Sequence, residues 1–213
     1  MLKVKICGIT SVADALAAAE EGADYVGLIF ARSPRRVDLK TAREIVRRLP
    51  RGVEPVGVFL DQSADDVRHL LDATGVGIAQ LHGAEPPAYA KELGVPVVKT
   101  FDTFSDASIE RLKAYDAFAF LLDVPKGEGA RARATIDVEW ARLARRHGRV
   151  ILAGRLDAAN VGEMVRRVRP WGVDTCRGTE KSPGVKDRAK LRDFVQAARA
   201  AHKETTKIRV RTR

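Results

Sequence analysis

The sequence predicts a single-domain α/β fold, a closed (β/α)₈ TIM barrel, and three observations support this. Short runs rich in Val, Ile, Leu and Phe alternate along the 213-residue chain with segments whose apolar residues recur at helical spacing. Strict alternation of this kind indicates a parallel sheet with crossover helices. No Pro- or Ser-rich linker divides the chain. We therefore expect one barrel over residues 1–202 and a basic, mobile tail over 203–213.

Eight runs have the composition of buried strands, and each is short enough for a compact barrel. In chain order they are residues 2–7, 25–30, 54–59, 77–81, 95–100, 117–122, 149–153 and 172–176. The longest irregular stretch, 123–135, follows the sixth strand, and long loops in compact domains are usually functional.

Amphipathic stripes and capping signals define the helices between these strands. Ser63 with Asp66 three residues later, and Asp38 before a helical pattern, are typical helix starts. The clearest apolar stripes are Ala42–Ile45–Val46–Leu49, Val161–Met164–Val165–Val168 and Leu191–Phe194–Val195–Ala198. A doubly wound open sheet is the alternative, but "CGITSVADA" after the first strand has one glycine and no dinucleotide-binding loop.

Composition excludes several functional classes. No stretch approaches the roughly 20 apolar residues of a membrane span, and no signal-peptide core is present. Two cysteines give no disulfide framework, which favours a cytoplasmic location, and no Cys/His cluster has the spacing of a metal site. The net charge of +10 favours anionic ligands, but with 6% aromatic residues a nucleic-acid partner is not expected.

Polar residues gather where the predicted strands end, at the face on which barrels bind ligands. Because side chains alternate along a strand, Lys5 and Cys7 share one face of the first strand. If Cys7 points into the barrel mouth, Lys5 lies one layer deeper in an apolar interior. A buried lysine is rare unless it is paired, so we expect a carboxylate partner for Lys5.

Motifs in the expected order resemble the phosphoribosylanthranilate isomerase family of tryptophan biosynthesis. They are "KICGIT", "GADYVGLIF", "QLHGAE", "LLD", "LAG" and "PGVKD", each close to the end of a strand or in the segment that follows it. The resemblance implies a (β/α)₈ barrel and an Amadori rearrangement of a phosphoribosyl aminobenzoate. It implies a small phosphosugar substrate, no cofactor, no metal, no membrane partner, and a monomer or homodimer.

The resemblance also implies roles for individual residues. Cys7 corresponds to the general base, and Asp123 to the general acid that opens the sugar ring. Arg35 matches an arginine that contacts the anthranilate carboxylate, and His82 lines the site. Six further residues fall in the substrate-binding region: Lys5, Gly154, Arg155, Asp174, Arg177 and Gly178.

Three loops depart from the family pattern. After the seventh strand "AGRL" replaces "AGGL", and after the eighth "DTCRGTE" replaces "DVSSGVE". The sixth loop has "KGEGARARATIDVEW" in place of a "GGTGKTFDW"-like segment. Arg155 and Arg177 are therefore predicted to contact the substrate phosphate directly. Two alternatives stay open: a related isomerase acting on another phosphosugar amine, and a catalytically silent barrel that binds anions or nucleic acid.

Overall fold

The computed structural model describes residues 1–102, 104–124 and 136–211, and only the backbone of 207–211. The elements in chain order are β1 (Lys3–Cys7), α1 (Val12–Glu20), β2 (Tyr25–Ile29), α2 (Leu39–Arg48), β3 (Glu54–Phe59), α3 (Ala64–Thr74), β4 (Ile78–Leu81), α4 (Pro87–Glu92), β5 (Val97–Phe101), α5 (Asp106–Lys113), β6 (Ala119–Leu122), α6 (Val138–Ala144), β7 (Val150–Leu152), α7 (Val161–Val168), β8 (Gly172–Thr175), the 3₁₀ turn η1 (Arg177–Thr179), β9 (Glu180–Ser182), β10 (Val185–Lys186) and α8 (Arg188–Arg211).

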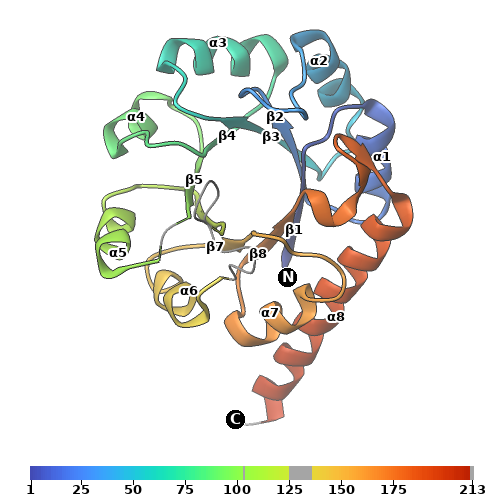
Figure 1. The fold of residues 1–213 in the computed structure, drawn as a ribbon, viewed down its shortest axis with the longest axis vertical. Helices are drawn as coiled ribbons and strands as arrows, with labels where there is room; N and C mark the ends of the chain where they lie inside the picture. Colours follow the sequence, from blue (N-terminus) through green and yellow to red (C-terminus); the bar gives the residue numbers. More distant parts are fainter. Residues whose placement is uncertain (103, 125–135, 212–213) are drawn as a thin grey trace.

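The eight strands β1 to β8 close into a barrel in sequence order, with helices arranged around the outside (Figure 1). Every neighbouring pair is parallel, and β8 pairs with β1 to close the ring. The predicted fold class is thus confirmed, and the open-sheet alternative is wrong. Parallel strands bring all their carboxyl ends to one rim, which gathers the residues that follow the strands around one opening.

Two apolar layers stabilise the barrel. The larger lies between the strands and the helices and includes all three predicted stripes, with Ala42, Ile45, Val165 and Phe194 fully buried. The smaller fills the barrel interior and consists of Val98, Ala119, Leu121, Ile151 and Ala153. Because this interior cluster plugs the barrel, ligand access is confined to its mouth.

Both predicted helix starts are confirmed. The Ser63 hydroxyl accepts a hydrogen bond from the Asp66 amide at 3.1 Å, and the Asp38 carboxylate accepts one from Thr41 at 2.7 Å. Side-chain caps of this kind satisfy amide groups that have no partner inside the helix.

The C-terminal part differs from the sequence-based expectation. A short antiparallel pair, β9 with β10, follows β8 and was not among the eight predicted strands. Residues 203–211 were predicted to form a tail beyond the last helix, but α8 continues to Arg211 and extends past the ring of helices (Figure 1). The 125–135 part of the predicted long loop lies outside the described residues. Among the residues described, none of the helices is long and apolar enough to span a membrane.

Candidate active site

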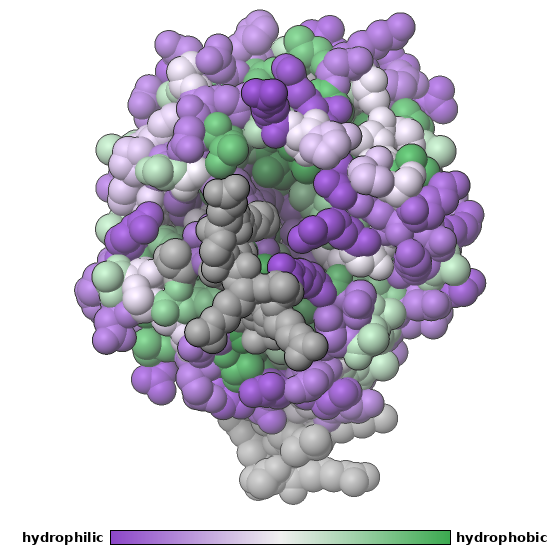
Figure 2. All heavy atoms as spheres, in the orientation of Figure 1, coloured by the Kyte–Doolittle hydropathy of each residue, from purple (hydrophilic) through white to green (hydrophobic). Residues whose placement is uncertain are grey.

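A cavity of about 770 Å³ opens at the carboxyl ends of the strands. Figure 2 shows this hollow at the centre of the barrel mouth, with hydrophilic side chains on its rim and hydrophobic ones deeper inside. Seven of the ten predicted site residues line it: Cys7, Arg35, His82, Asp123, Arg155, Asp174 and Arg177.

Lys5 lies one layer below the cavity, in the barrel interior. Its ammonium donates a hydrogen bond to the Asp174 carboxylate at 2.9 Å, and the two side chains are 2% and 9% exposed. Burial opposes the charge on Lys5, but the Asp174 carboxylate and Cys7 outweigh it and raise the pKa of Lys5. The predicted carboxylate partner of this lysine is therefore confirmed, and it comes from the neighbouring strand β8.

Cys7 ends β1 and is buried at the bottom of the cavity. A hydrogen bond from Cys176 and the positive charges of Lys5 and Lys186 outweigh burial and the nearby Asp174, and they lower the pKa of the Cys7 thiol to about 6. The shift favours the thiolate, the form in which a cysteine accepts a proton or attacks an electrophile.

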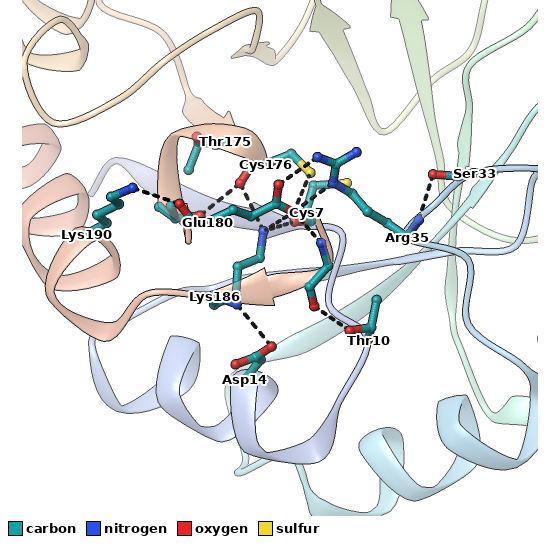
Figure 3. Close-up of polar contacts among 12 residues, drawn as sticks. Cys7, Thr10, Asp14, Ser33, Arg35, Thr175, Cys176, Glu180, Lys186 and Lys190 are labelled. Carbon is teal, nitrogen blue, oxygen red and sulfur yellow. Dashed lines mark hydrogen bonds and ion pairs between the residues drawn. The ribbon is translucent and has the colours of Figure 1, made fainter. Parts of the chain in front are cut away.

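Cys176 is the partner that lowers the Cys7 pKa most. Its Sγ lies beside that of Cys7, and the Cys176 thiol is also within hydrogen-bonding distance of the acceptor Glu180 Oε1, at 3.7 Å (Figure 3). The hydrogen bond to Cys7, together with burial, raises the pKa of Cys176, so this thiol keeps its proton while Cys7 is ionised. Sequence reasoning recorded Cys176 as a departure from the family pattern but assigned it no role. The signal that could have indicated a role for Cys176 is its position: it directly follows β8, the strand that pairs with β1, which ends at Cys7.

Lys186 links the last residue of β1 to the residue that follows β8. Its ammonium is fully buried and donates to the carbonyl oxygens of Cys7 at 2.7 Å and Cys176 at 3.0 Å. It also lies 3.4 Å from Glu180 Oε1. Sequence reasoning missed both Lys186 and Glu180 as functional residues, although each lies in a quoted family motif, because only the fold of the loop after β8 brings them under Cys7.

Arg35 is held in one orientation by Glu180. The Arg35 Nε donates to Glu180 Oε1 at 2.7 Å and its Nη2 to Oε2 at 2.6 Å. These hydrogen bonds raise the pKa of Arg35. They also outweigh burial and, with Lys186, lower the pKa of Glu180. A planar guanidinium that is fixed on one edge still presents its other edge to a ligand in the cavity.

Asp123 and His82 form the opposite side of the site. Asp123 follows β6 and accepts a hydrogen bond from the Val124 amide at 2.9 Å. His82 Nε2 lies 3.7 Å from Asp123 Oδ2, and His82 Nδ1 lies 3.4 Å from the amide nitrogen of Gln80. Gln80, a cavity-lining residue that sequence reasoning missed, thus orients the ring that faces Asp123.

The two predicted glycines support the loops and do not line the cavity. A Cβ at Gly178 would lie 2.1 Å from the Leu156 carbonyl oxygen, so only glycine lets the loops after β7 and β8 pack this closely. Gly154 has a φ of +76° and a Cβ there would meet the Val124 amide at 2.9 Å. The next residue, Arg155, also has a positive φ of +59°, which is strained for a residue with a side chain.

Arg155 and Arg177, on the loops after β7 and β8, are exposed at the rim of the cavity, as is Arg32. Arg155 and Arg177 line the cavity, as predicted for residues that contact a phosphate. Within the described part of the chain, no group of three or more His, Cys, Asp or Glu side chains could hold a metal ion.

Comparison with known proteins places this geometry in a family. The family model for N-(5'-phosphoribosyl)anthranilate isomerase matches residues 4–197. The chain belongs to this family. A relative from Geobacter sp. (strain M21), an N-(5'-phosphoribosyl)anthranilate isomerase, is 43% identical over 202 residues, which cover 93% of this chain and 98% of the relative.

Solved structures of the isomerase family have the same fold. The monomeric form of the dimeric phosphoribosylanthranilate isomerase from Thermotoga maritima is 34% identical with a TM-score of 0.84, covering 94% of this chain and 100% of that one. A second phosphoribosyl anthranilate isomerase was solved in complex with reduced 1-(o-carboxyphenylamino)-1-deoxyribulose 5-phosphate. It is 32% identical, also with a TM-score of 0.84, and covers the same shares of the two chains.

Proposed function

We propose that the chain converts N-(5'-phosphoribosyl)anthranilate to 1-(2-carboxyphenylamino)-1-deoxyribulose 5-phosphate, with Cys7 as the general base and Asp123 as the general acid. The observation that carries this proposal is the placement of the two groups. The Cys7 thiolate and the Asp123 carboxyl group line one cavity from the ends of β1 and β6, so they reach a bound sugar from different sides.

The reaction needs one proton delivered and one removed. Asp123 protonates the ribose ring oxygen, the bond from C1′ to that oxygen breaks, and the nitrogen lone pair forms a C1′=N iminium. The Cys7 thiolate then removes the proton on C2′, and the electron pair moves into the C1′–C2′ bond to give an enolamine. Delivery of a proton to C1′ and loss of the enol proton yield the ketone, so electrons are only redistributed within the substrate and no cofactor is needed.

The remaining site residues bind the two anionic ends of the substrate. Arg35, held by Glu180, presents its free edge to the anthranilate carboxylate. Arg155 and Arg177 contact the phosphate from the loops after β7 and β8, where barrels commonly bind phosphate. Lys5 and Asp174 set the charge beneath Cys7.

The decisive experiment follows the loss of phosphoribosylanthranilate fluorescence with purified protein, together with complementation of a tryptophan auxotroph that lacks this step. Cys7→Ala is expected to lower kcat by at least about 10²-fold with KM within a few-fold, because only the proton transfer is lost. Asp123→Asn keeps its shape but has no proton to donate, so kcat falls at every pH. Folded wild-type protein without activity, or near wild-type turnover in Cys7→Ala, would contradict the proposal.

The phosphate contact has its own test, because Arg155 and Arg177 depart from the family pattern. A charge-assisted hydrogen bond contributes about 1.5–3 kcal/mol, so Arg177→Ser is expected to raise KM about 10- to 150-fold. Inorganic phosphate, a competitive inhibitor on this view, becomes weaker by a similar factor. If the wild type instead turns over another phosphosugar amine faster, the related-isomerase alternative is correct.

Location and assembly follow from the same assignment. We infer a cytoplasmic enzyme, because the two cysteines are free thiols and Cys7 must stay reduced to act as a base. The assembly is a monomer or a homodimer, as proposed from the sequence. Light scattering at assay concentration distinguishes the two.

A further inference from the structure

The two cysteines of the chain lie at the neighbouring ends of β1 and β8: Cys7 is the last residue of β1, and Cys176 directly follows β8. In the β1–β8 pair, Lys5 is in register with Asp174 and Ile6 with Thr175. The next residue after each of these last partners is Cys7 on β1 and Cys176 just beyond β8. Since side chains alternate along β1, Cys7 points into the barrel like Lys5, and Cys176 lines the same cavity.

The packing around the strand ends holds the two sulfur atoms close together. Neighbouring strands lie about 4.8 Å apart, within the range of Cα separations that a disulfide bridges. Lys186 binds the carbonyl oxygens of both cysteines, which fixes the two backbones relative to each other. A Cβ at Gly8 would lie 2.7 Å from the Cys176 Sγ, so the absence of a side chain there leaves room for that sulfur. Figure 3 shows the two sulfur atoms side by side, between Arg35 and Lys186.

We propose that Cys7 and Cys176 form a reversible oxidation site, in which a peroxide converts the two thiols into an intramolecular disulfide. The inference goes beyond the isomerase activity, although its effect on turnover rests on the proposed role of Cys7. Disulfide formation removes the thiolate that acts as the base, so the oxidised protein is inactive until a dithiol reduces it.

The chemistry proceeds in two balanced steps. The Cys7 thiolate attacks one oxygen of hydrogen peroxide, the O–O bond breaks, and the departing hydroxide takes up a proton to leave as water, giving Cys7 sulfenic acid. The Cys176 thiol then attacks the Cys7 Sγ, and its proton leaves with the sulfenic hydroxyl as a second water. Two electrons pass from the two thiols to one peroxide, and two waters form.

The pair also divides the two tasks that such a site requires. Cys7 carries the thiolate that reacts with the oxidant, while Cys176 keeps its proton and resolves the sulfenic acid. A serine at position 176 would offer no sulfur for the second step. The protein with serine there would leave Cys7 sulfenic acid exposed to a further peroxide, which gives the irreversible sulfinic acid.

The test counts thiols and measures mass, so it does not depend on activity. Full-length protein is treated with a few equivalents of hydrogen peroxide, denatured and titrated for thiols. We expect both thiols to disappear, a mass loss of about two hydrogens with the Cys7 and Cys176 peptides linked, and full recovery of thiols with dithiothreitol. Non-reducing electrophoresis shows a monomer if the bond is intramolecular.

Cys176→Ser is the matched variant, and its circular dichroism spectrum establishes that it is folded. We expect its single thiol to be lost with a mass gain of one or two oxygens, and not to be recovered by dithiothreitol after excess peroxide. Retention of both thiols in the wild type, a linkage between two chains, or equal recovery in wild type and Cys176→Ser would overturn the proposal. If the disulfide forms and the reduced protein is inactive, the oxidation site stands and the isomerase assignment fails.

Discussion

The acidity of Cys7 depends on three residues from the other end of the chain. Cys176 donates a hydrogen bond to the thiolate, Lys186 adds positive charge, and Asp174 holds the ammonium of Lys5 next to it. Deleting Cys176 removes the largest of these contributions and leaves the burial that opposes ionisation. The acidity of the Cys7 thiol is therefore set by the residues gathered at the ends of β1 and β8 and not by the cysteine alone.

The pH dependence of kcat/KM is expected to report the pKa of Cys7 directly. Catalysis needs the thiolate, so kcat/KM should fall tenfold per unit as the pH drops below about 6, the pKa of Cys7. In Cys176→Ala this limb should move up towards the ordinary thiol pKa of about 8.5. Because the Cys7 pKa is lower in the folded state, its ionisation also stabilises the fold above the unfolded-state value, and that contribution is lost as the pH falls through 6.

Rates of alkylation by iodoacetamide across the same pH range check the assignment without substrate. The thiolate is the reactive form, so the alkylation rate of Cys7 should follow the same midpoint in each protein. If the midpoint on the acidic side of the kcat/KM profile does not move when Cys176 is replaced, the hydrogen bond from Cys176 does not set the pKa of Cys7.

Most site residues at or just after the strand ends could be predicted from the sequence, whereas Gln80 on β4 and the residues of the β9–β10 segment could not. Alternation along β1 placed Lys5 and Cys7 on one inward face, and the need to pair a buried lysine predicted its carboxylate partner. Glu180 and Lys186 escaped prediction because the path of β9 and β10, which brings them under Cys7, leaves no periodic signal in the sequence.

At the level of elements, the seam between β1 and β8 carries a buried ion pair. Breaking such a pair by removing one partner costs about 3–5 kcal/mol, since the other charge stays buried without compensation. Lys5→Met is therefore expected to lower the free energy of unfolding by that amount, measured by urea denaturation. Lys5 and Asp174 close the barrel as well as support the base.

Lys3→Met is a matched control on the same strand. Lys3 binds Asp24 at 2.8 Å, but its side chain is 38% exposed, so solvent screens the pair and the expected loss is at most about 1 kcal/mol. Equal losses for the two variants would show that burial does not govern the strength of the Lys5–Asp174 pair.

Two arginines have a positive φ, and comparing them separates the cost of backbone strain from a contribution to phosphate binding. Arg155, after β7, and Arg169, after α7, have φ values of +59° and +54°. A left-handed conformation costs a residue with a Cβ about 1–2 kcal/mol, so Arg169→Gly should raise the melting temperature and leave phosphate inhibition unchanged. Arg155→Gly relieves the same strain but should also weaken inhibition by phosphate. If both variants behave alike in the two measurements, Arg155 makes no phosphate contact.

Helix starts were predictable because a cap is a local event, and helix ends were harder to predict. Ser63 and Asp38 cap their helices through amides only three residues away. The end of α8 carries no Gly or Pro stop signal, and the basic composition of 203–213 suggested a tail where the helix in fact continues to Arg211.

For the molecule as a whole, the net charge of +10 acts on a substrate that carries a carboxylate and a phosphate. Salt screens such attraction, because the Debye length falls from about 30 Å at 0.01 M to about 3 Å at 1 M. We expect KM to rise several-fold between low and high KCl, with kcat nearly constant. The Arg155→Gly/Arg177→Ser double variant should show a shallower dependence, and a KM independent of salt in the wild type would contradict steering by the rim arginines.

Topology was the most predictable property of the whole molecule. Strict alternation of strands and helices permits few arrangements, and the lack of a dinucleotide loop favoured the closed one. What alternation does not encode is which side chains meet across the closed ring. Cys7 and Cys176 lie 169 positions apart in the sequence, and only closure of the ring through β8 and β1 brings them together.

The hydrogen bond from Lys186 to the Cys7 carbonyl spans 179 positions of the chain, and this has a consequence for synthesis. Because synthesis runs from the amino end, Cys7 leaves the ribosome long before Asp174, Cys176 and Lys186. A nascent chain halted before β8 already carries Cys7 and Lys5, but it lacks Cys176, Lys186 and the Asp174 carboxylate that holds Lys5. Its thiol then lacks the hydrogen bond that lowers the Cys7 pKa most, and the base forms only after the segment from β8 to β10 has been synthesised and has closed the ring.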